Sequence, residues 1–127
     1  MRVKEVMTAD PACCISETAL QEVAQMMVDH DCGEIPVVEN KETKLPIGVI
    51  TDRDIVCRGL AGHNFDAGRA TARDVMTPGI HCCREDDDLA KAVRHMEGLQ
   101  VRRLPVINKS KRMVGILSLG DVSHSAP

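Results

Sequence analysis

Gly48-Val-Ile-Thr-Asp-Arg-Asp54 is the stretch of sequence that decides the fold, because the chain carries a second version of it, Gly115-Ile-Leu-Ser-Leu-Gly-Asp121. In both stretches a glycine precedes a short β-rich run, and a hydroxyl residue is followed three positions later by an aspartate. This order is typical of a strand that ends where a helix begins. The sequence therefore predicts the same strand-to-helix junction twice.

The repeat extends well beyond this junction. When the sequence is shifted by 69 residues, identical short segments superimpose along each copy. The matching pairs are Val6-Met7-Thr8 with Val75-Met76-Thr77, Cys13-Cys14 with Cys82-Cys83, and Pro36-Val37 with Pro105-Val106. Self-similarity at one period indicates a duplicated structural unit, here of about 55 residues.

Each copy predicts the same series of elements. A short extended run with the cysteine doublet (12–15, 80–83) leads into an amphipathic helix, and two β-rich runs and a shorter helix follow. Apolar residues at helical spacing mark the helices: Leu20, Val23, Ala24 and Met27, then Leu89, Ala92, Val93 and Met96. The β-rich runs are 35–38 and 46–50, then 104–107 and 113–117. Thr18 and Gln21 predict a capping box for the first helix.

The predicted fold class is α/β, of the mixed α+β kind, with two β-α-β-β-α repeats. Repeat 1 spans residues 3–61, a linker spans 62–71, and repeat 2 spans 72–123. A unit this small cannot bury its own sheet face well. We therefore expect the repeats to pack sheet to sheet about a pseudo-twofold axis, as one compact module.

Composition argues against several classes of partner. The 16 Lys and Arg against 19 Asp and Glu give a net charge of −3, so no basic field favours nucleic acid or anionic membranes. Phe65 is the single aromatic residue, which removes the rings on which single-stranded nucleic acids stack. No apolar run is long enough to span a membrane and the first residues lack a signal peptide, so we expect a cytoplasmic protein with reduced thiols.

The cysteine doublets are interpreted as packing residues. Adjacent residues of a strand point to opposite faces, so one doublet cannot present both sulfur atoms to one metal ion. A metal or thiol site would need one cysteine of each doublet with Cys32 or Cys57, or with a histidine such as His63, His81 or His95. We predict no metal site, and a thiol- or metal-responsive sensor remains the alternative.

The Thr51/Asp54 and Ser118/Asp121 pairs have two compatible interpretations. Each pair fits a helix N-cap with an acidic residue at the third position. The same geometry offers a hydroxyl and free backbone N–H groups to a phosphate, and a carboxylate to a ribose diol. Motifs of catalytic centres are missing from the sequence, including a P-loop, H-E-x-x-H and G-x-S-x-G, so we predict no catalytic residues and a protein that is not an enzyme.

These features together resemble a tandem cystathionine-β-synthase (CBS) domain pair, also called a Bateman module. The resemblance rests on Val-Met-Thr at the start of each repeat, Ile-Pro-Val-Val and Leu-Pro-Val-Ile, and the closing Gly-x-x-Thr/Ser-x-x-Asp. It covers the chain from about Val3 to Val122, and its specificity comes from the ordered set that occurs twice.

The resemblance implies two clefts that bind AMP, ADP, ATP, S-adenosylmethionine or NAD-type ligands as regulators, with no cofactor required. In this family each cleft combines the hydroxyl and Asp of one repeat with a base pocket from the other. Carried over, the first cleft would comprise Val49, Thr51, Arg53, Asp54, Thr77, Cys82, Val101 and Arg102. The second would comprise Ile116, Ser118, Asp121, Thr8, Cys13, Cys32 and Gly33.

The two predicted clefts differ in charge. Arg53 and Arg102 accompany Asp54, whereas Gly120 and Gly33 take their places beside Asp121, so we expect a phosphorylated adenosine to prefer the first cleft. The resemblance also implies a homodimer, for which Ile55, Val56 and Leu60 are candidate contacts, and an unidentified protein partner. A dimerisation module that binds no ligand is a further alternative.

Overall fold

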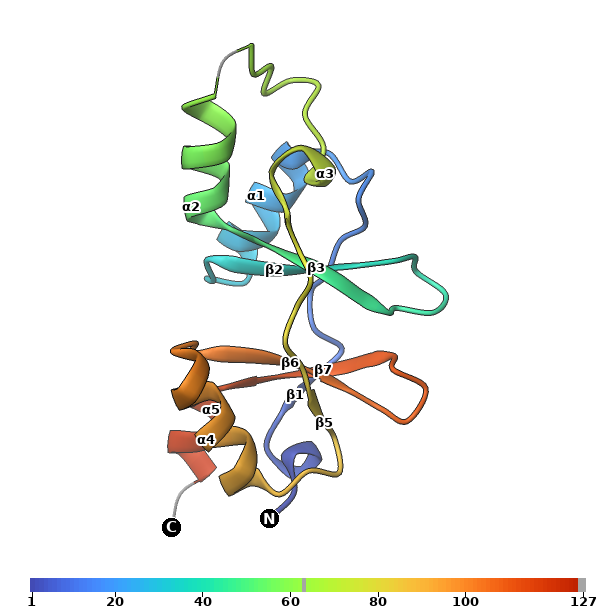
Figure 1. Cartoon of the computed structure of the whole chain (residues 1–127), viewed down its shortest axis with the longest axis vertical. Helices are drawn as coiled ribbons and strands as arrows, with labels where there is room; N and C mark the ends of the chain where they lie inside the picture. Colours follow the sequence, from blue (N-terminus) through green and yellow to red (C-terminus); the bar gives the residue numbers. More distant parts are fainter. Residues whose placement is uncertain (63, 126–127) are drawn as a thin grey trace. The chain divides into compact units, whose positions relative to one another are not determined.

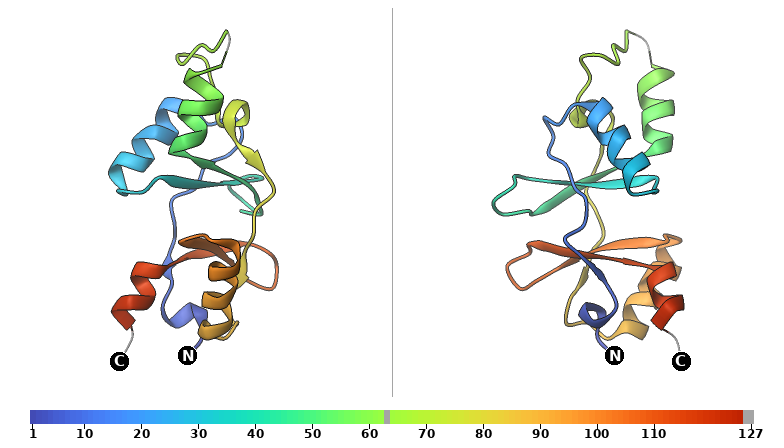
Figure 2. Two further views of the ribbon diagram at one scale, coloured as in Figure 1. Left: turned by 60° about the vertical axis from the view of Figure 1, so that its left-hand side comes forward. Right: turned by 180° about the vertical axis from the view of Figure 1, so that it is seen from behind.

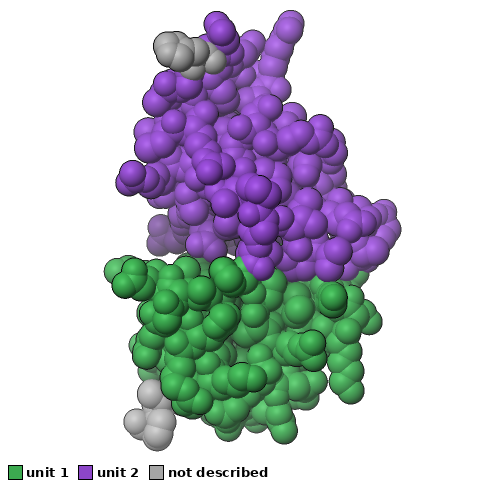
Figure 3. Space-filling model, viewed as in Figure 1, with its two compact units in different colours: residues 1–11, 81–127 green, residues 12–80 purple. Residues whose placement is uncertain are grey.

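The structure, a computed structural model, describes residues 1–62 and 64–125. It divides into two compact units (Figure 3). Unit 1 comprises Met1–Pro11 with His81–Pro127, and unit 2 comprises Ala12–Ile80. His63, which belongs to the predicted linker and was a candidate metal ligand, lies outside the described residues.

Unit 2 contains a three-stranded antiparallel sheet with the order β2-β3-β4. Its elements are α1 (Leu20–Asp29), β2 (Glu34–Val38), β3 (Pro46–Thr51), α2 (Asp52–Asp54), α3 (Ala72–Val75) and β4 (Thr77–Pro78). Helix α2 continues directly into a π-helix, η2 (Ile55–Leu60). Helices α1 and α2 lie on the same face of the β2–β3 hairpin (Figures 1 and 2).

Unit 1 repeats this plan with a four-stranded sheet of order β1-β7-β6-β5. Its elements are η1 (Val3–Glu5), β1 (Thr8–Ala9), β5 (Cys83–Arg84), α4 (Leu89–Leu99), β6 (Arg103–Ile107), β7 (Met113–Ser118) and α5 (Leu119–Ser125). Strand β5 runs parallel to β6, and the other pairings are antiparallel. The predicted mixed α+β class is confirmed, with a β-hairpin followed by a helix in both units.

The first strand of each sequence repeat pairs with the hairpin of the other repeat. Thr8 of β1 lies opposite Ile116 of β7, and Thr77 of β4 lies opposite Val49 of β3. The compact units therefore cut across the sequence repeats. The boundaries 3–61, 62–71 and 72–123 describe the duplication and stay a prediction.

Each unit has its own apolar core, and the predicted helix spacing supplies part of it. Leu20, Val23 and Met27 of α1 are buried, as are Ala92 and Met96 of α4. The sheets contribute larger aliphatic side chains from their inner faces, among them Ile35, Ile50, Leu104, Val106 and Leu117. Burial of each such side chain is worth about 1.5–3 kcal/mol. Aliphatic residues therefore supply most of each core, and Phe65 packs against that of unit 2.

The cysteine doublets behave as extended chain predicts. Cys14 and Cys83 are buried in the two cores, while Cys13 and Cys82 are partly exposed. Of the four doublet cysteines, Cys83 is the one that belongs to a strand, β5. Cys14 forms a single parallel bridge with Val37.

The predicted capping box of the first helix is wrong. The N-cap of α1 is Ala19, which has no side-chain capping bond. The Thr18 hydroxyl instead accepts the backbone N–H of Ile15 at 3.0 Å, because the chain turns before the helix begins. Of the helices that the structure describes, none is both long and apolar enough to cross a bilayer.

Candidate functional site

The end of β3 and the start of α2 hold Thr51 and Asp54 in a reciprocal arrangement. The Thr51 hydroxyl accepts the N–H of Asp54 at 3.1 Å, and the Asp54 carboxylate accepts the N–H of Thr51 at 2.9 Å. This capping box confirms the structural interpretation of the pair. It also fixes the hydroxyl and the carboxylate side by side, with acceptor capacity left on both carboxylate oxygens.

Two arginines bring positive charge to this junction. The Arg58 Nε lies 3.8 Å from Asp54 Oδ1, and its Nη1 donates to the Met76 carbonyl at 3.2 Å. Arg53 is exposed, and its guanidinium has no ion pair or hydrogen bond to the residues that the structure describes. Arg53 was predicted for this site. Arg58 was missed, although its i,i+4 spacing from Asp54 on a predicted helix was the available signal.

A segment of the second repeat completes the site in unit 2. Val49 and Thr77 face each other in the β3–β4 ladder. The two strands approach closely at Gly48, where a Cβ atom would lie 2.6 Å from the Thr77 carbonyl oxygen. The glycine is therefore required by the backbone that passes over it. Val49, Thr51, Arg53, Asp54 and Thr77 form what we call the Thr51 site.

Unit 1 contains the corresponding Ser118 site, formed by Thr8, Ile116, Ser118 and Asp121. The Ser118 hydroxyl accepts the N–H of Asp121 at 3.1 Å at the start of α5. The Thr8 hydroxyl donates to the Asp121 carboxylate at 3.2 Å. Thr8 reaches it because β1 pairs with β7 and places Thr8 opposite Ile116. A Cβ atom at Gly115 would lie 2.9 Å from the Thr8 carbonyl oxygen, so the glycine has the same role here.

The two sites differ in how the carboxylate is neutralised. Asp54 faces a guanidinium, whereas Asp121 is bonded to a neutral hydroxyl. Gly120 occupies the position of Arg53 in the second copy. The Thr51 site therefore has more positive charge beside its carboxylate than the Ser118 site has. The predicted contribution of Arg102 to that charge stays a prediction.

The remaining predicted residues do not lie in the same unit as the Thr/Ser–Asp pair that they were expected to join. Cys82, Val101 and Arg102 lie in unit 1, and Cys13, Cys32 and Gly33 lie in unit 2. Within their own units Gly33 and Arg102 hold matching positions, because their carbonyls accept the N–H groups of Asp52 and Leu119 at the helix starts (2.9 and 3.0 Å). Their contribution to the nucleotide clefts stays a prediction.

Burial makes three of the six thiols poor ligands and poor nucleophiles. Desolvation raises the pKa of Cys14 and of Cys83 to about 12, with smaller contributions from neighbouring acidic groups, and raises the pKa of Cys82 to about 11. Thiolate is the form that binds metals and attacks electrophiles. Within residues 1–62 and 64–125, no three His, Cys, Asp or Glu side chains are grouped so that they could hold a metal ion.

The chain, with its duplicated Thr/Ser–Asp junctions and with the first strand of each repeat paired to the hairpin of the other, is similar to known proteins. The sequence model for the CBS domain matches residues 3–59 and 72–126. The chain belongs to the CBS domain family. The match covers both repeats.

Relatives with the CBS domain align over nearly the full chain. YlbB of Bacillus subtilis is 37% identical over 124 residues, covering 98% of this chain and 81% of YlbB. Hypoxic response protein 1 of Mycobacterium tuberculosis is 33% identical over 124 residues, covering 98% and 84% of the two chains.

Two solved structures of CBS proteins contain bound groups. Hypoxic Response Protein I, solved with two coordinated zinc ions, has a TM-score of 0.86 and 32% identity, covering 100% of both chains. The CBS domain pair of protein MJ0100, in complex with 5′-methylthioadenosine and S-adenosyl-L-methionine, has a TM-score of 0.79 and 25% identity, covering 98% of this chain and 94% of that one.

Proposed function

We propose that this protein is a regulatory module without catalytic activity, which binds an adenosine-containing ligand at its Thr51 and Ser118 sites. The observation that carries the proposal is the hydroxyl–carboxylate pair held at a strand-to-helix junction in both units. A carboxylate in this position can accept two hydrogen bonds from a ribose diol. The adenosyl ligands of the MJ0100 CBS pair support the same ligand class.

The charge difference leads us to expect different ligands at the two sites. Arg53 and Arg58 favour a phosphate at the Thr51 site, since guanidinium groups form strong bonds to phosphate oxygens. The Ser118 site lacks an arginine at the position of Arg53 and suits a less charged nucleoside. We therefore expect AMP, ADP or ATP at the Thr51 site. S-adenosylmethionine or a neutral nucleoside would bind at the Ser118 site.

Regulation would arise from differential affinity. A ligand at the Thr51 site would contact both sequence repeats, because Thr77 comes from the second repeat and Asp54 from the first. Such a ligand favours the conformation that it binds best, and by no more than its difference in affinity between conformations. The response would be transmitted through a homodimer or to a protein partner.

The dimer contact proposed from the sequence is η2. Val56 and Leu60 are 53% and 63% exposed, whereas Ile55 packs against the core of unit 2. Val56 and Leu60 therefore carry this part of the proposal. A cytoplasmic location also belongs to the proposal, because the buried Cys14 and Cys83 carry no disulfide.

The test is a thermal-shift panel with AMP, ADP, ATP, S-adenosylmethionine and NAD on the wild-type chain, Asp54→Asn and Asp121→Asn. Asparagine keeps an acceptor for the helix cap and removes the charge, so the folded state is retained. A ligand at a hundred times its Kd adds about 2.7 kcal/mol of apparent stability. AMP should stabilise the wild type and Asp121→Asn, and fail to stabilise Asp54→Asn. No shift with any of the five ligands would refute the proposal.

A second candidate function is zinc binding, which the zinc-containing structure of Hypoxic Response Protein I favours. Within residues 1–62 and 64–125, however, no three His, Cys, Asp or Glu side chains are grouped so that they could hold the ion. Metal analysis of purified protein, with a thiol titration under native conditions, separates the two functions. Stoichiometric zinc, whose removal by a chelator increases the number of reactive thiols, would favour the metal site. Absence of zinc, with the same number of reactive thiols before and after the chelator, would exclude it.

A further inference from the structure

A pocket of about 550 Å³ lies in unit 1, between the edge strand β5 and helix α4. Its volume falls within the range of about 300–1,000 Å³ that is typical of small-molecule sites. It contains no residue of the Thr51 site or the Ser118 site, and it shares Cys82 with the first nucleotide cleft predicted from the sequence.

The floor of the pocket is apolar. Cys83 and Ala92 are buried, and Ile107 is partly buried beside them. Burial keeps the Cys82 and Cys83 thiols protonated at neutral pH, and a protonated thiol packs as a small hydrophobic group. An apolar part of a ligand would therefore meet a neutral surface.

The rim of the pocket is cationic. Arg84, Lys91 and Arg94 are exposed, and none of them forms an ion pair with any residue in the ranges 1–62 and 64–125. Among the described lining residues there is one carboxylate, that of Asp87, which accepts the backbone N–H of Arg84 at 2.9 Å. Three cations against one carboxylate leave an excess of positive charge around the opening.

The other copy of the repeat shows that the fold does not require these cations. At a shift of 69 residues the floor is retained, whereas the rim is not. The floor residues Cys83, Ala92 and Ile107 correspond to Cys14, Val23 and Val38, and the rim residues Arg84, Lys91 and Arg94 correspond to Ile15, Glu22 and Gln25. The cations are therefore particular to unit 1, although the packing beneath them is shared.

We propose that the pocket between α4 and β5 binds a phosphate ester with an apolar body. The two guanidinium groups and the ammonium group would hold the phosphate, because arginine suits bidentate phosphate contacts and lysine adds a point charge. The apolar body would lie on Cys83, Ala92 and Ile107. This pocket contains no residue of the Thr51 or Ser118 site, and the proposal does not depend on ligand binding at either of them.

The experiment titrates the full chain with phenyl phosphate by isothermal calorimetry, with inorganic phosphate as the comparison. The key variant is Lys91→Glu/Arg94→Gln, which gives α4 the residues that α1 carries at the same positions. These side chains are exposed, so the folded state should be unaffected. The control is Lys41→Gln, an exposed lysine of the β2–β3 turn.

We expect phenyl phosphate to bind about tenfold more tightly than inorganic phosphate, because only the ester covers the floor. The double variant should weaken it by at least about tenfold, and Lys41→Gln should leave it unchanged. Absence of saturable binding below about 10 mM, or equal affinity in the double variant, would overturn the proposal. Competition by AMP that Asp54→Asn abolishes would also overturn it, since the ester would then occupy the Thr51 site.

Discussion

The Nε atom of Arg58 lies 3.8 Å from Oδ1 of Asp54, one helical turn further along the α2–η2 helix. The Arg58 side chain is 52% exposed, whereas the Asp54 side chain is 16% exposed. A pair so open to solvent contributes less than about 1 kcal/mol to folding. Its more important consequence is that the Thr51 site presents a cation next to its carboxylate.

Replacing Arg58 should therefore affect phosphate recognition more than stability. We expect Arg58→Gln to raise the Kd for AMP about tenfold and the Kd for adenosine less than about twofold, because adenosine lacks the phosphate. Calorimetric titration with both ligands measures the difference.

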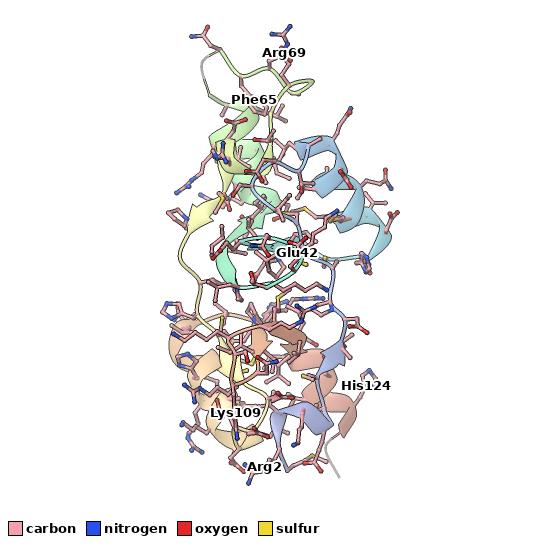
Figure 4. All side chains as sticks on the ribbon, turned by 90° about the vertical axis from the view of Figure 1, so that its right-hand side faces the viewer. Arg2, Glu42, Phe65, Arg69, Lys109 and His124 are labelled. Carbon is pink, nitrogen blue, oxygen red and sulfur yellow. The ribbon has the colours of Figure 1, made fainter. Side chains whose placement is uncertain are left out.

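The control for Arg58 is Arg69→Gln. Arg69 is exposed and pairs with Asp66 at 3.9 Å, in the loop at the end of unit 2 that lies away from Glu42 of the β2–β3 turn (Figure 4). The Arg69→Gln variant should leave the dissociation constants of AMP and adenosine unchanged. Equal weakening of AMP and adenosine by Arg58→Gln would show that Arg58 positions the helix and does not contact phosphate.

The two junction glycines should be intolerant of a methyl group. A Cβ atom at Gly48 would lie 2.6 Å from the Thr77 carbonyl oxygen, and one at Gly115 would lie 2.9 Å from that of Thr8. We expect Gly48→Ala and Gly115→Ala to lower the free energy of unfolding by about 1–3 kcal/mol each, because backbone atoms must move. Urea denaturation provides the measurement.

Gly98 is the matched control for these substitutions. It lies in α4, and a Cβ atom there would meet nothing within 4 Å. Gly98→Ala should raise the free energy of unfolding by about 0.5–1 kcal/mol through helix propensity. Similar small effects at Gly48 and Gly98 would contradict the close approach of β4 to β3.

The exposed face of η2 should control oligomeric state. We expect the wild-type chain to be a dimer, and Val56→Asp/Leu60→Asp to be a folded monomer, because burying two carboxylates in an apolar contact is unfavourable. Light scattering coupled to gel filtration distinguishes the two. Val28→Asp, at a residue of α1 that is 73% exposed, should remain dimeric. A monomeric wild type would refute the dimer.

Stability should fall in alkaline solution because of the buried thiols. Burial raises the pKa of Cys14 from 9.0 to about 12, so the folded state keeps a proton that the unfolded chain releases above pH 9. The stabilisation is fully present below pH 9 and is lost as the pH rises towards 12. Each such thiol lowers the free energy of unfolding by up to about 1.4 kcal/mol per pH unit in that interval.

Urea denaturation between about pH 8 and about pH 10 tests this dependence. Cys14→Ala should show a shallower decline than the wild type, whereas Cys57→Ala, which removes an exposed thiol, should decline like the wild type. The same slope in all three proteins would mean that burial does not raise the pKa of Cys14.

The periodic parts of the fold could be predicted from the sequence. Leu20, Val23 and Met27 predict the buried stripe of α1, because helical spacing is a local property. The repeat itself predicts the second hairpin from the first. By contrast, the cap of α1 could not be predicted, since Thr18 has a choice of N–H groups and bonds to Ile15.

The candidate site was predictable only where its residues are close in sequence. Thr51 with Asp54, and Ser118 with Asp121, follow from a three-residue spacing. The bond from Thr8 to Asp121 joins residues 113 apart, and the family resemblance supplied that pairing where local chemistry could not. Arg58 was not predicted because an arginine on a helix surface usually extends into solvent.

The pairing of β1 with β7 and of β4 with β3 has a consequence for the origin of the chain. A protein with a single copy of the repeat would have a hairpin that lacks its neighbouring strand. The backbone at Gly48 or Gly115, which the neighbouring strand approaches closely, would then be uncovered. Two identical copies could satisfy each other only by swapping their leading segments. A chain that carries both copies makes these pairings within one molecule. Each half can then differ in sequence from the other, while neither can be removed without leaving a hairpin unpaired.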